Sequence, residues 1–197
     1  MHLPTPQFSR LVTVLAFDLS DPSLDSMILA WDHITTRFIN PIRHHREAAG
    51  RIESIRLLSI HDAVHAVFGS GGGYVFKRSA PDDSLGAALA ATARASHDVL
   101  AAVFRSPSQQ EDLKHTLEES LSLVSDARER VAGSLSGSQS AASYLLTFAP
   151  FIEKVREVVY ENHEHPAAGF VSTPFPPIRS LVTRPHFHGG LQWRRSA

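Results

Sequence analysis

The stretch "SLGAALAATARASHDVLAAVF", residues 84–104, carries a helical pattern that is rich in alanine and other small side chains. Pro81 precedes it, and proline is favoured where a helix opens. Alanine has the highest helix propensity and little bulk, so neighbouring helices can approach such a segment closely. We therefore expect a helix that is packed on several sides.

Two amphipathic patterns precede this stretch. The first begins at Asp21 and Pro22, an N-cap residue followed by proline at the first helical position, and runs as far as Pro41. Its apolar stripe comprises Leu24, Met27, Ile28, Trp31, Ile34, Thr35 and Phe38. The second begins near Ala48 and ends at "GSGGG" (69–73), a strong helix terminator. Its strip comprises Ile52, Ile55, Leu58, Ser59, Asp62, Ala63, Ala66 and Val67.

Two more helical segments follow the alanine-rich stretch. Ser106, Pro107 and Gln109 have the form of a capping box, which predicts a helix through Leu123. A further helix is predicted from near Asp126 to Tyr160. Pro150 lies within it and is expected to kink or split it, because proline lacks the amide hydrogen that a helix interior needs.

These patterns predict an all-α fold, a helical bundle of five or six helices, over residues 1–160. The periodicity is lost after that, and the sequence becomes rich in Pro, His and Gly. We expect an irregular C-terminal tail over residues 161–197. The apolar run "LVTVLAF" (11–17) lacks a small-residue cleavage site, so we interpret it as a buried segment rather than a signal peptide.

The composition excludes several classes of protein. The chain has 197 residues, of which 43% are hydrophobic, as in a globular domain with its own core. Its 19 basic and 20 acidic residues give no global field that would attract nucleic acid. No apolar run approaches the roughly 18–20 residues of a membrane span. The absence of cysteine excludes disulfides and thiolate metal sites. It does not fix the compartment, although we favour the cytoplasm.

His61 and His65, in "SIHDAVHAVF", stand four residues apart on a predicted helix. This spacing places both imidazoles on one face, where a metal ion could bridge them. The sequence differs from the HExxH motif because Asp62 follows the first histidine, and no third ligand is identifiable. The alternative is a structural His–Asp pair that caps or bonds a neighbouring helix. The adjacent "GSGGGYVFK" (69–77) lacks the GK[ST] ending of a phosphate loop, so we expect a flexible connection.

The predicted tail carries two further short patterns. Histidines cluster in "ENHEHP" (His163 and His165) and in "PHFHGG" (His186 and His188), and His-rich tracts can bind metal. The segment "TPFPPIRS" (173–180) contains P-x-x-P-x-R. That pattern is typical of polyproline II ligands, which aromatic-lined grooves bind.

The segments "MILAWDHITTRFI" (27–39) and "GRIESIRLLSIHDAVHAVF" (50–68) resemble the N-terminal helices of the vanadium-dependent haloperoxidases and their acid phosphatase (PAP2) relatives. That family has a helix with W-N or W-D and then a helix of the type R-x-L-x-x-x-H-x-A-x-x-D-A. The corresponding residues here are Trp31, Asp32, Arg56, His61, Asp62 and Ala63. The resemblance covers about residues 24–150, where the order and lengths of the packing helices carry it. It implies that these residues have a structural role.

The resemblance also implies a site in the tail. Family members hold vanadate or phosphate with a lysine, a W-R-P arginine, the motif P-F-P-x-Y-P-S-G-H and the motif R-x-x-G-G-x-H. Here "PFPPIRSLV" is similar to the first of these two motifs, and it would offer Ser180 and Arg179 to an anion. "HFHGGLQW" is similar to the second, with His186 at the position of the arginine and Gln192 at that of the metal-binding histidine. No counterpart of the lysine or of the W-R-P arginine is found.

These differences predict little or no activity. Val182 replaces a histidine and cannot transfer a proton, and Leu181 replaces a glycine and would block the approach of the backbone to an oxyanion. We therefore expect a truncated haloperoxidase-like protein that binds no vanadate itself. The alternative is a non-catalytic helical binding or assembly module. Its partner would be a second copy of the chain or a separate C-terminal half.

Overall fold

The computed structural model describes residues 23–43, 45–69, 72–77 and 83–164. The described residues form six α-helices and one short 3-10 helix and contain no strand, which confirms the predicted all-α bundle. The elements are α1 (Leu24–Ile39), η1 (Asn40–Ile42), α2 (Arg46–Phe68), α3 (Leu85–Val103), α4 (Pro107–Ser122), α5 (Ala127–Thr147) and α6 (Ala149–Glu164). None of these helices is both long and apolar enough to cross a membrane.

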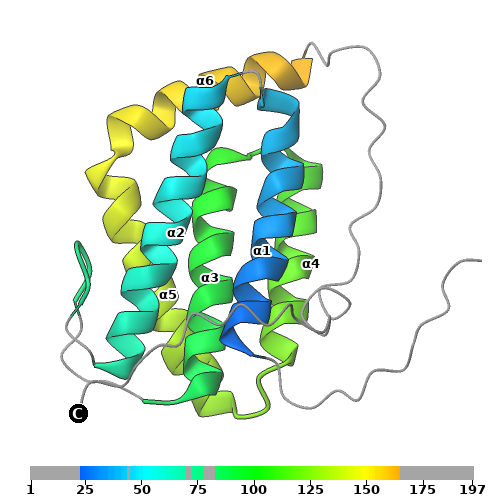
Figure 1. The fold of residues 1–197 in the computed structure, drawn as a ribbon. Helices are drawn as coiled ribbons and strands as arrows, with labels where there is room; N and C mark the ends of the chain where they lie inside the picture. The colour runs from blue at the N-terminus through cyan, green and yellow to red at the C-terminus, as the bar shows by residue number, and fades with distance from the viewer. Residues whose placement is uncertain (1–22, 44, 70–71, 78–82, 165–197) are drawn as a thin grey trace, which may run out of the picture.

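Helix α3 lies at the centre of the bundle, as Figure 1 shows. It packs against α1, α2, α4 and α5, while α6 crosses one end of the bundle (Figure 1). Six of its alanines have no exposed surface: Ala87, Ala88, Ala90, Ala91, Ala93 and Ala95. The prediction that this alanine-rich helix is packed on several sides is confirmed.

Large apolar side chains fill the space between α3 and its neighbours. The predicted stripe of α1 faces this core through Met27, Trp31, Ile34, Thr35 and Phe38, all of which are buried. The rings of Phe38 and Phe104 lie 5.1 Å apart between centroids, so the end of α1 is packed against the end of α3. On α2, Ile52, Ile55, Ser59, Asp62, Ala63, Ala66 and Val67 are buried, in agreement with the strip read from the sequence.

Two glycines of α5 allow this helix to lie directly on the backbone of α3. A Cβ atom at Gly133 would overlap the carbonyl oxygen of Ala87 and would lie 2.8 Å from the Cβ of Ala90. A Cβ atom at Gly137 would lie 2.5 Å from the carbonyl oxygen of Ala91. The two helices are thus closer than any other side chain would permit at these positions.

The helix ends follow mostly local signals. Ser106 caps α4 as predicted, with its hydroxyl oxygen 3.4 Å from the amide of Gln109. Asp126 caps α5. The helix predicted to continue to Tyr160 is interrupted between Thr147 and Ala149, next to Pro150, as expected. The predicted start of the first helix was wrong. Its N-cap is Ser23, whose hydroxyl accepts a hydrogen bond from the amide of Ser26.

Helix α6 continues to Glu164, four residues into the range predicted as tail. Residues 165–197 lie outside the described part of the chain, as does the apolar segment 11–17.

The contact between α3 and α5 predicts opposite effects for two glycine substitutions. Gly133→Ala should lower the free energy of unfolding by about 2–3 kcal/mol, because the new methyl group cannot fit against the α3 backbone. Gly50→Ala is the matched control, since a Cβ there would meet nothing within 4 Å. It should raise the free energy of unfolding by about 0.5–1 kcal/mol through better helix propensity. Urea unfolding followed by circular dichroism measures both, and equal stabilities for the two variants would contradict this packing.

Candidate functional site

The main polar cluster of the described residues surrounds Asp62 on α2. Helix α2 ends at Gly69, whose φ of 64° lets the chain reverse direction. The chain then returns along α2, and Gly73 passes so close that a Cβ there would lie 3.5 Å from the Asp62 carboxyl carbon. Consequently the segment 72–77 lies against the helix that precedes it.

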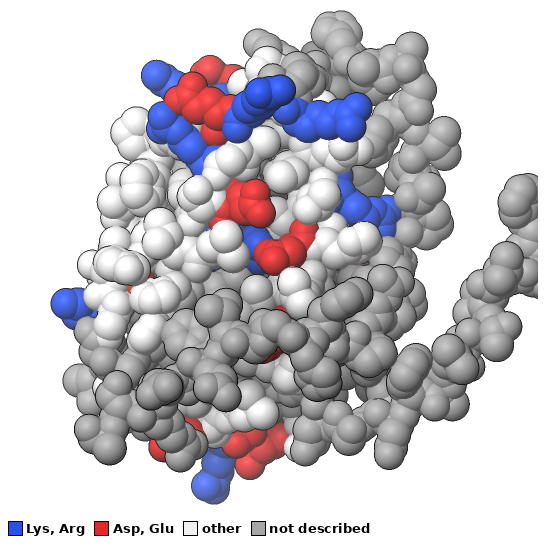
Figure 2. Space-filling model, in the orientation of Figure 1, with Lys and Arg blue, Asp and Glu red and all other residues white. Residues whose placement is uncertain are grey.

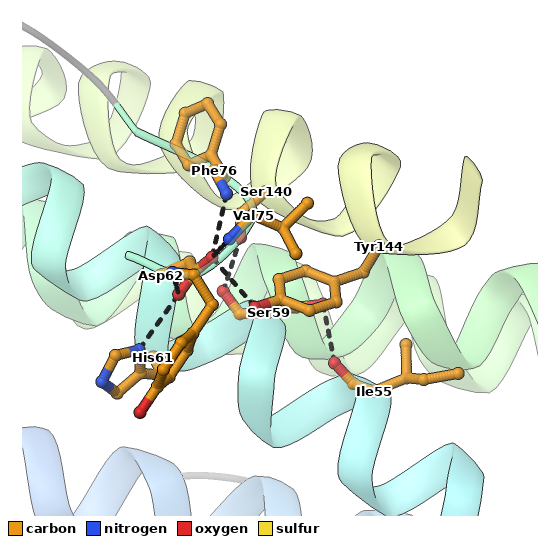
Figure 3. Close-up of polar contacts among 9 residues, drawn as sticks. Ile55, Ser59, His61, Asp62, Val75, Phe76, Ser140 and Tyr144 are labelled. Carbon is orange, nitrogen blue, oxygen red and sulfur yellow. Dashed lines mark hydrogen bonds and ion pairs between the residues drawn. The ribbon is translucent and has the colours of Figure 1, made fainter. Parts of the chain in front are cut away.

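Asp62 binds this returning segment through its backbone. The Tyr74 amide donates to Oδ1 at 2.9 Å, and the amides of Val75 and Phe76 donate to Oδ2 at 2.8 and 2.9 Å (Figure 3). Three successive amide groups therefore point at one carboxylate. The sequence predicted a flexible connection here, whereas residues 74–76 are fixed to α2.

Two side chains complete the coordination of the carboxylate. The Tyr144 hydroxyl, from α5, donates to Oδ2 at 2.9 Å, and His61 Nδ1 lies 3.0 Å from Oδ1. Asp62 itself has no exposed surface. A carboxylate offers about four lone-pair directions, so all of its capacity is used. We call Asp62, His61, Tyr144 and residues 74–76 the Asp62 cluster.

The electrostatics of the cluster keep Asp62 ionised. Burial alone would raise the pKa of its carboxyl, but the hydrogen bonds from the loop backbone and from His61 outweigh it and hold the pKa below its ordinary value. The pKa of Tyr144 is raised by burial and by its bond to the carboxylate, so its proton stays on the phenol. The pair is suited to holding two helices together and not to proton transfer.

The histidine pair stands at the edge of this cluster. The rings of His61 and His65 lie 4.1 Å apart between centroids, and Tyr74 stacks on His61 at 5.0 Å. Burial and the neighbouring His61 lower the pKa of His65, with Asp62 acting in the opposite direction. Within the described ranges, no three His, Cys, Asp or Glu side chains are grouped so that they could hold a metal ion. The contact between His61 and Asp62 corresponds to the structural alternative for this pair.

One further hydrogen bond joins α2 to α5 beside the Asp62 cluster, and a second bond within α2 adjoins it. The Ser140 hydroxyl donates to the carbonyl oxygen of Ser59 at 2.8 Å, and the Ser59 hydroxyl donates to that of Ile55 at 2.7 Å (Figure 3). Both serines are fully buried. The bonds from Ser140 and Tyr144 together fix the position of α5 along the axis of α2.

The other motif residues join α1 to α2. Arg56 has no exposed surface and forms an ion pair with Asp32, whose side chain is 36% exposed. Burial lowers the pKa of the Arg56 guanidinium, although Asp32 opposes the shift. Trp31 is also fully buried, on the same side of α1 as the rest of the core. The structure thus places Trp31, Asp32, Arg56 and Asp62 at contacts between helices, while His61 contacts Asp62 and His65 on its own helix and Tyr74 in the returning segment.

The remaining predicted site residues lie outside the described part of the chain. These are Arg179, Ser180, His186 and His188, together with His165 and the P-x-x-P-x-R segment. His163 falls on α6. Tyr144 and the amides of residues 74–76 were not predicted from the sequence, because a tyrosine on a helical face is usually a core residue and a segment as short as "YVFK" (74–77) shows no periodicity.

Comparison of the chain with known protein families, with curated proteins and with solved structures found no match. The resemblance to the haloperoxidases therefore remains a prediction from the sequence.

The Asp62 cluster predicts a specific cost for losing one hydroxyl group. Tyr144→Phe should lower the free energy of unfolding by about 1.5–3 kcal/mol, because a buried carboxylate loses a donor that nothing replaces. Tyr74→Phe removes the same group from a residue that is 72% exposed and binds Asp62 only through its amide, so it should change stability by less than about 0.5 kcal/mol. Urea denaturation of both variants is the measurement. A similar loss in both would show that the Tyr144 bond has no special weight.

Proposed function

We propose that this chain is a haloperoxidase-like helical protein with little or no peroxidase activity of its own, whose bundle serves as a scaffold. The resemblance supplies the family. The location of Trp31, Arg56 and Asp62 at contacts between helices agrees with the structural role that the resemblance implies for them.

The observation that carries the proposal is the saturation of Asp62. A carboxylate that itself acts as a general acid or base needs a free lone pair near its substrate, whereas one that only orients a histidine does not. Here both carboxylate oxygens accept bonds from the protein, and the side chain has no contact with solvent. The carboxylate can therefore stabilise the bundle and hold His61, but it has no position for a reacting group itself.

The tail sequence supports the same conclusion by a separate route. Val182 and Gln192 stand at the positions of the two family histidines, and Leu181 stands at a glycine. Without those imidazoles the chain lacks both the proton shuttle and the ligand that the family provides to vanadium. Burying a trianion without its cations would also be costly.

A bromination assay tests this proposal. The full chain, incubated with vanadate, bromide and hydrogen peroxide, should brominate a phenol dye no faster than vanadate does in its absence. The reason is that the tail lacks the family histidines at positions 182 and 192. Turnover that requires the protein and is abolished by phosphate would overturn the proposal, since phosphate competes for an oxyanion site.

The second candidate, an assembly module, is favoured by the outward face of α5. The chain carries no charged residue or histidine from position 131 to position 152. On that face Val131, Leu135 and Leu146 are 70%, 48% and 78% exposed, and Ala142 is exposed between them. These positions recur at helical spacing and, with the exposed Gln139 between Leu135 and Ala142, form an uncharged and mostly apolar stripe. Exposed apolar surface is a common property of sites that bind another protein. The partner would be a second copy of the chain or a separate C-terminal half.

Light scattering after size exclusion tests the case in which the partner is a second copy. The wild-type chain should show a mass that rises with concentration, and Leu135→Glu should return it to a monomer by placing a charge on the stripe. Leu29→Glu is the matched control, because Leu29 is 50% exposed on α1, and it should leave the association unchanged. A wild-type chain that stays monomeric at all concentrations would count against self-association.

A further inference from the structure

Residues at the start of α2 and on α6 line a groove. These two segments lie at the end of the bundle that α6 crosses (Figure 1). Its volume is about 440 Å³, within the range of small-molecule sites. The inner part of one wall is fixed, because the Arg156 side chain of α6 donates from Nε to the carbonyl oxygen of Ala102 at 2.7 Å. Val155 beside it is buried in the core. The groove is thus a feature of packed helices.

The rim of this groove is positively charged. His45, Arg46, Arg51 and Lys154 line it, against one acidic residue, Glu47. Figure 2 shows basic side chains in blue along this end of the bundle, around a smaller acidic patch. Since the whole chain has a formal net charge of −1, this is a local concentration of cations.

The cations of the rim are not equivalent. Arg51 is paired with Glu47 at 2.5 Å, and its guanidinium lies 3.8 Å from the centroid of the Phe151 ring. Arg46 and Lys154 are exposed, and neither has an ion-pair partner among the described residues. Two positive charges therefore remain to attract an anion after the internal pair is counted.

The floor of the groove is apolar. Ala48 and Val155 are buried there, and Phe151 and Val158 are half-buried. A simple inorganic anion would leave this apolar surface exposed to water, whereas a hydrocarbon chain would bury it, which lowers the free energy of the complex. The site thus combines an apolar floor with a cationic rim, which suits a ligand with an apolar body and one anionic end.

We propose that this groove binds a small amphipathic carboxylate, such as a medium-chain fatty acid. The carboxylate is attracted by Arg46 and Lys154, and the hydrocarbon chain lies on Phe151, Val155 and Val158. This activity is independent of the proposed scaffold function, because the groove shares no residue with the Asp62 cluster. Affinity should fall with salt, since the cations are exposed.

Titration of the full chain with decanoate, below the concentration at which it forms micelles, tests the proposal. Calorimetry should detect binding of one decanoate, and amide shifts in heteronuclear NMR should concentrate on residues 45–51 and 151–158. Acetate has the same carboxylate without the chain and should bind at least about tenfold more weakly. Decanol has the chain without the charge and should also bind more weakly. Equal binding of acetate, or shifts that map elsewhere, would overturn the proposal.

A charge-matched pair of variants separates the groove from general electrostatics. Arg46→Gln combined with Lys154→Gln should weaken decanoate binding about tenfold. Lys114→Gln combined with Arg128→Gln removes the same net charge from exposed positions on α4 and α5, and should change the affinity by less than about twofold. Equal affinities of the two double variants would overturn the assignment. Binding to anionic lipid vesicles without binding to monomeric decanoate would identify a membrane surface instead, and would also overturn it.

Discussion

The close approach of α5 to α3 is the constraint on which the rest of the bundle depends. Helix α3 is enclosed by its neighbours, and six of its alanines have no exposed surface. A helix with larger side chains could not occupy that position at the same spacing, because interiors are packed near crystal density. The two glycines of α5 contact the backbone of α3 itself. The close approach therefore requires small residues on α5 as well as on α3. The positions of α1, α2 and α4 depend on α3 in turn, because each of these helices packs against it.

Packing of small side chains fixes distance but leaves two helices free to slide, and the polar contacts remove that freedom. The hydrogen bonds from Tyr144 and Ser140 join α5 to two points on α2 that are three residues apart. Asp62 is tolerated as a buried charge because it receives backbone and side-chain donors at both oxygens. Arg56 is less completely satisfied: one guanidinium nitrogen binds the partly exposed Asp32, while Nε and Nη1 are buried without a hydrogen-bond partner among the described residues.

Signals within one helix were predictable from the sequence, and contacts between distant segments were not. The alanine pattern of α3, the cap at Ser106 and the break beside Pro150 each depend on residues within one or two turns. The start of α1 was misplaced because Asp21 and Pro22 form a plausible cap two residues before Ser23, and only the folded backbone decides between them. Tyr144 lies 82 residues from Asp62, and a short apolar segment such as 74–76 has no period that could reveal which of its amides are used. The role of Asp62 therefore depended on geometry.

The groove and the Asp62 cluster lie at separate places along α2. Arg46, at the groove, and Asp62 are 16 residues apart on this helix, which is about 24 Å at 1.5 Å per residue. That distance exceeds the Debye length of roughly 8–10 Å at physiological ionic strength, so an anion in the groove has little direct effect on the Asp62 carboxylate. Such a ligand would instead bear on α6, which joins α5 at the break beside Pro150 and is held to α3 by the bond from Arg156 to Ala102. A ligand in the groove would therefore act on the packing of α6 against the first turns of α2, while the Asp62 cluster holds the register of α2 and α5 further along.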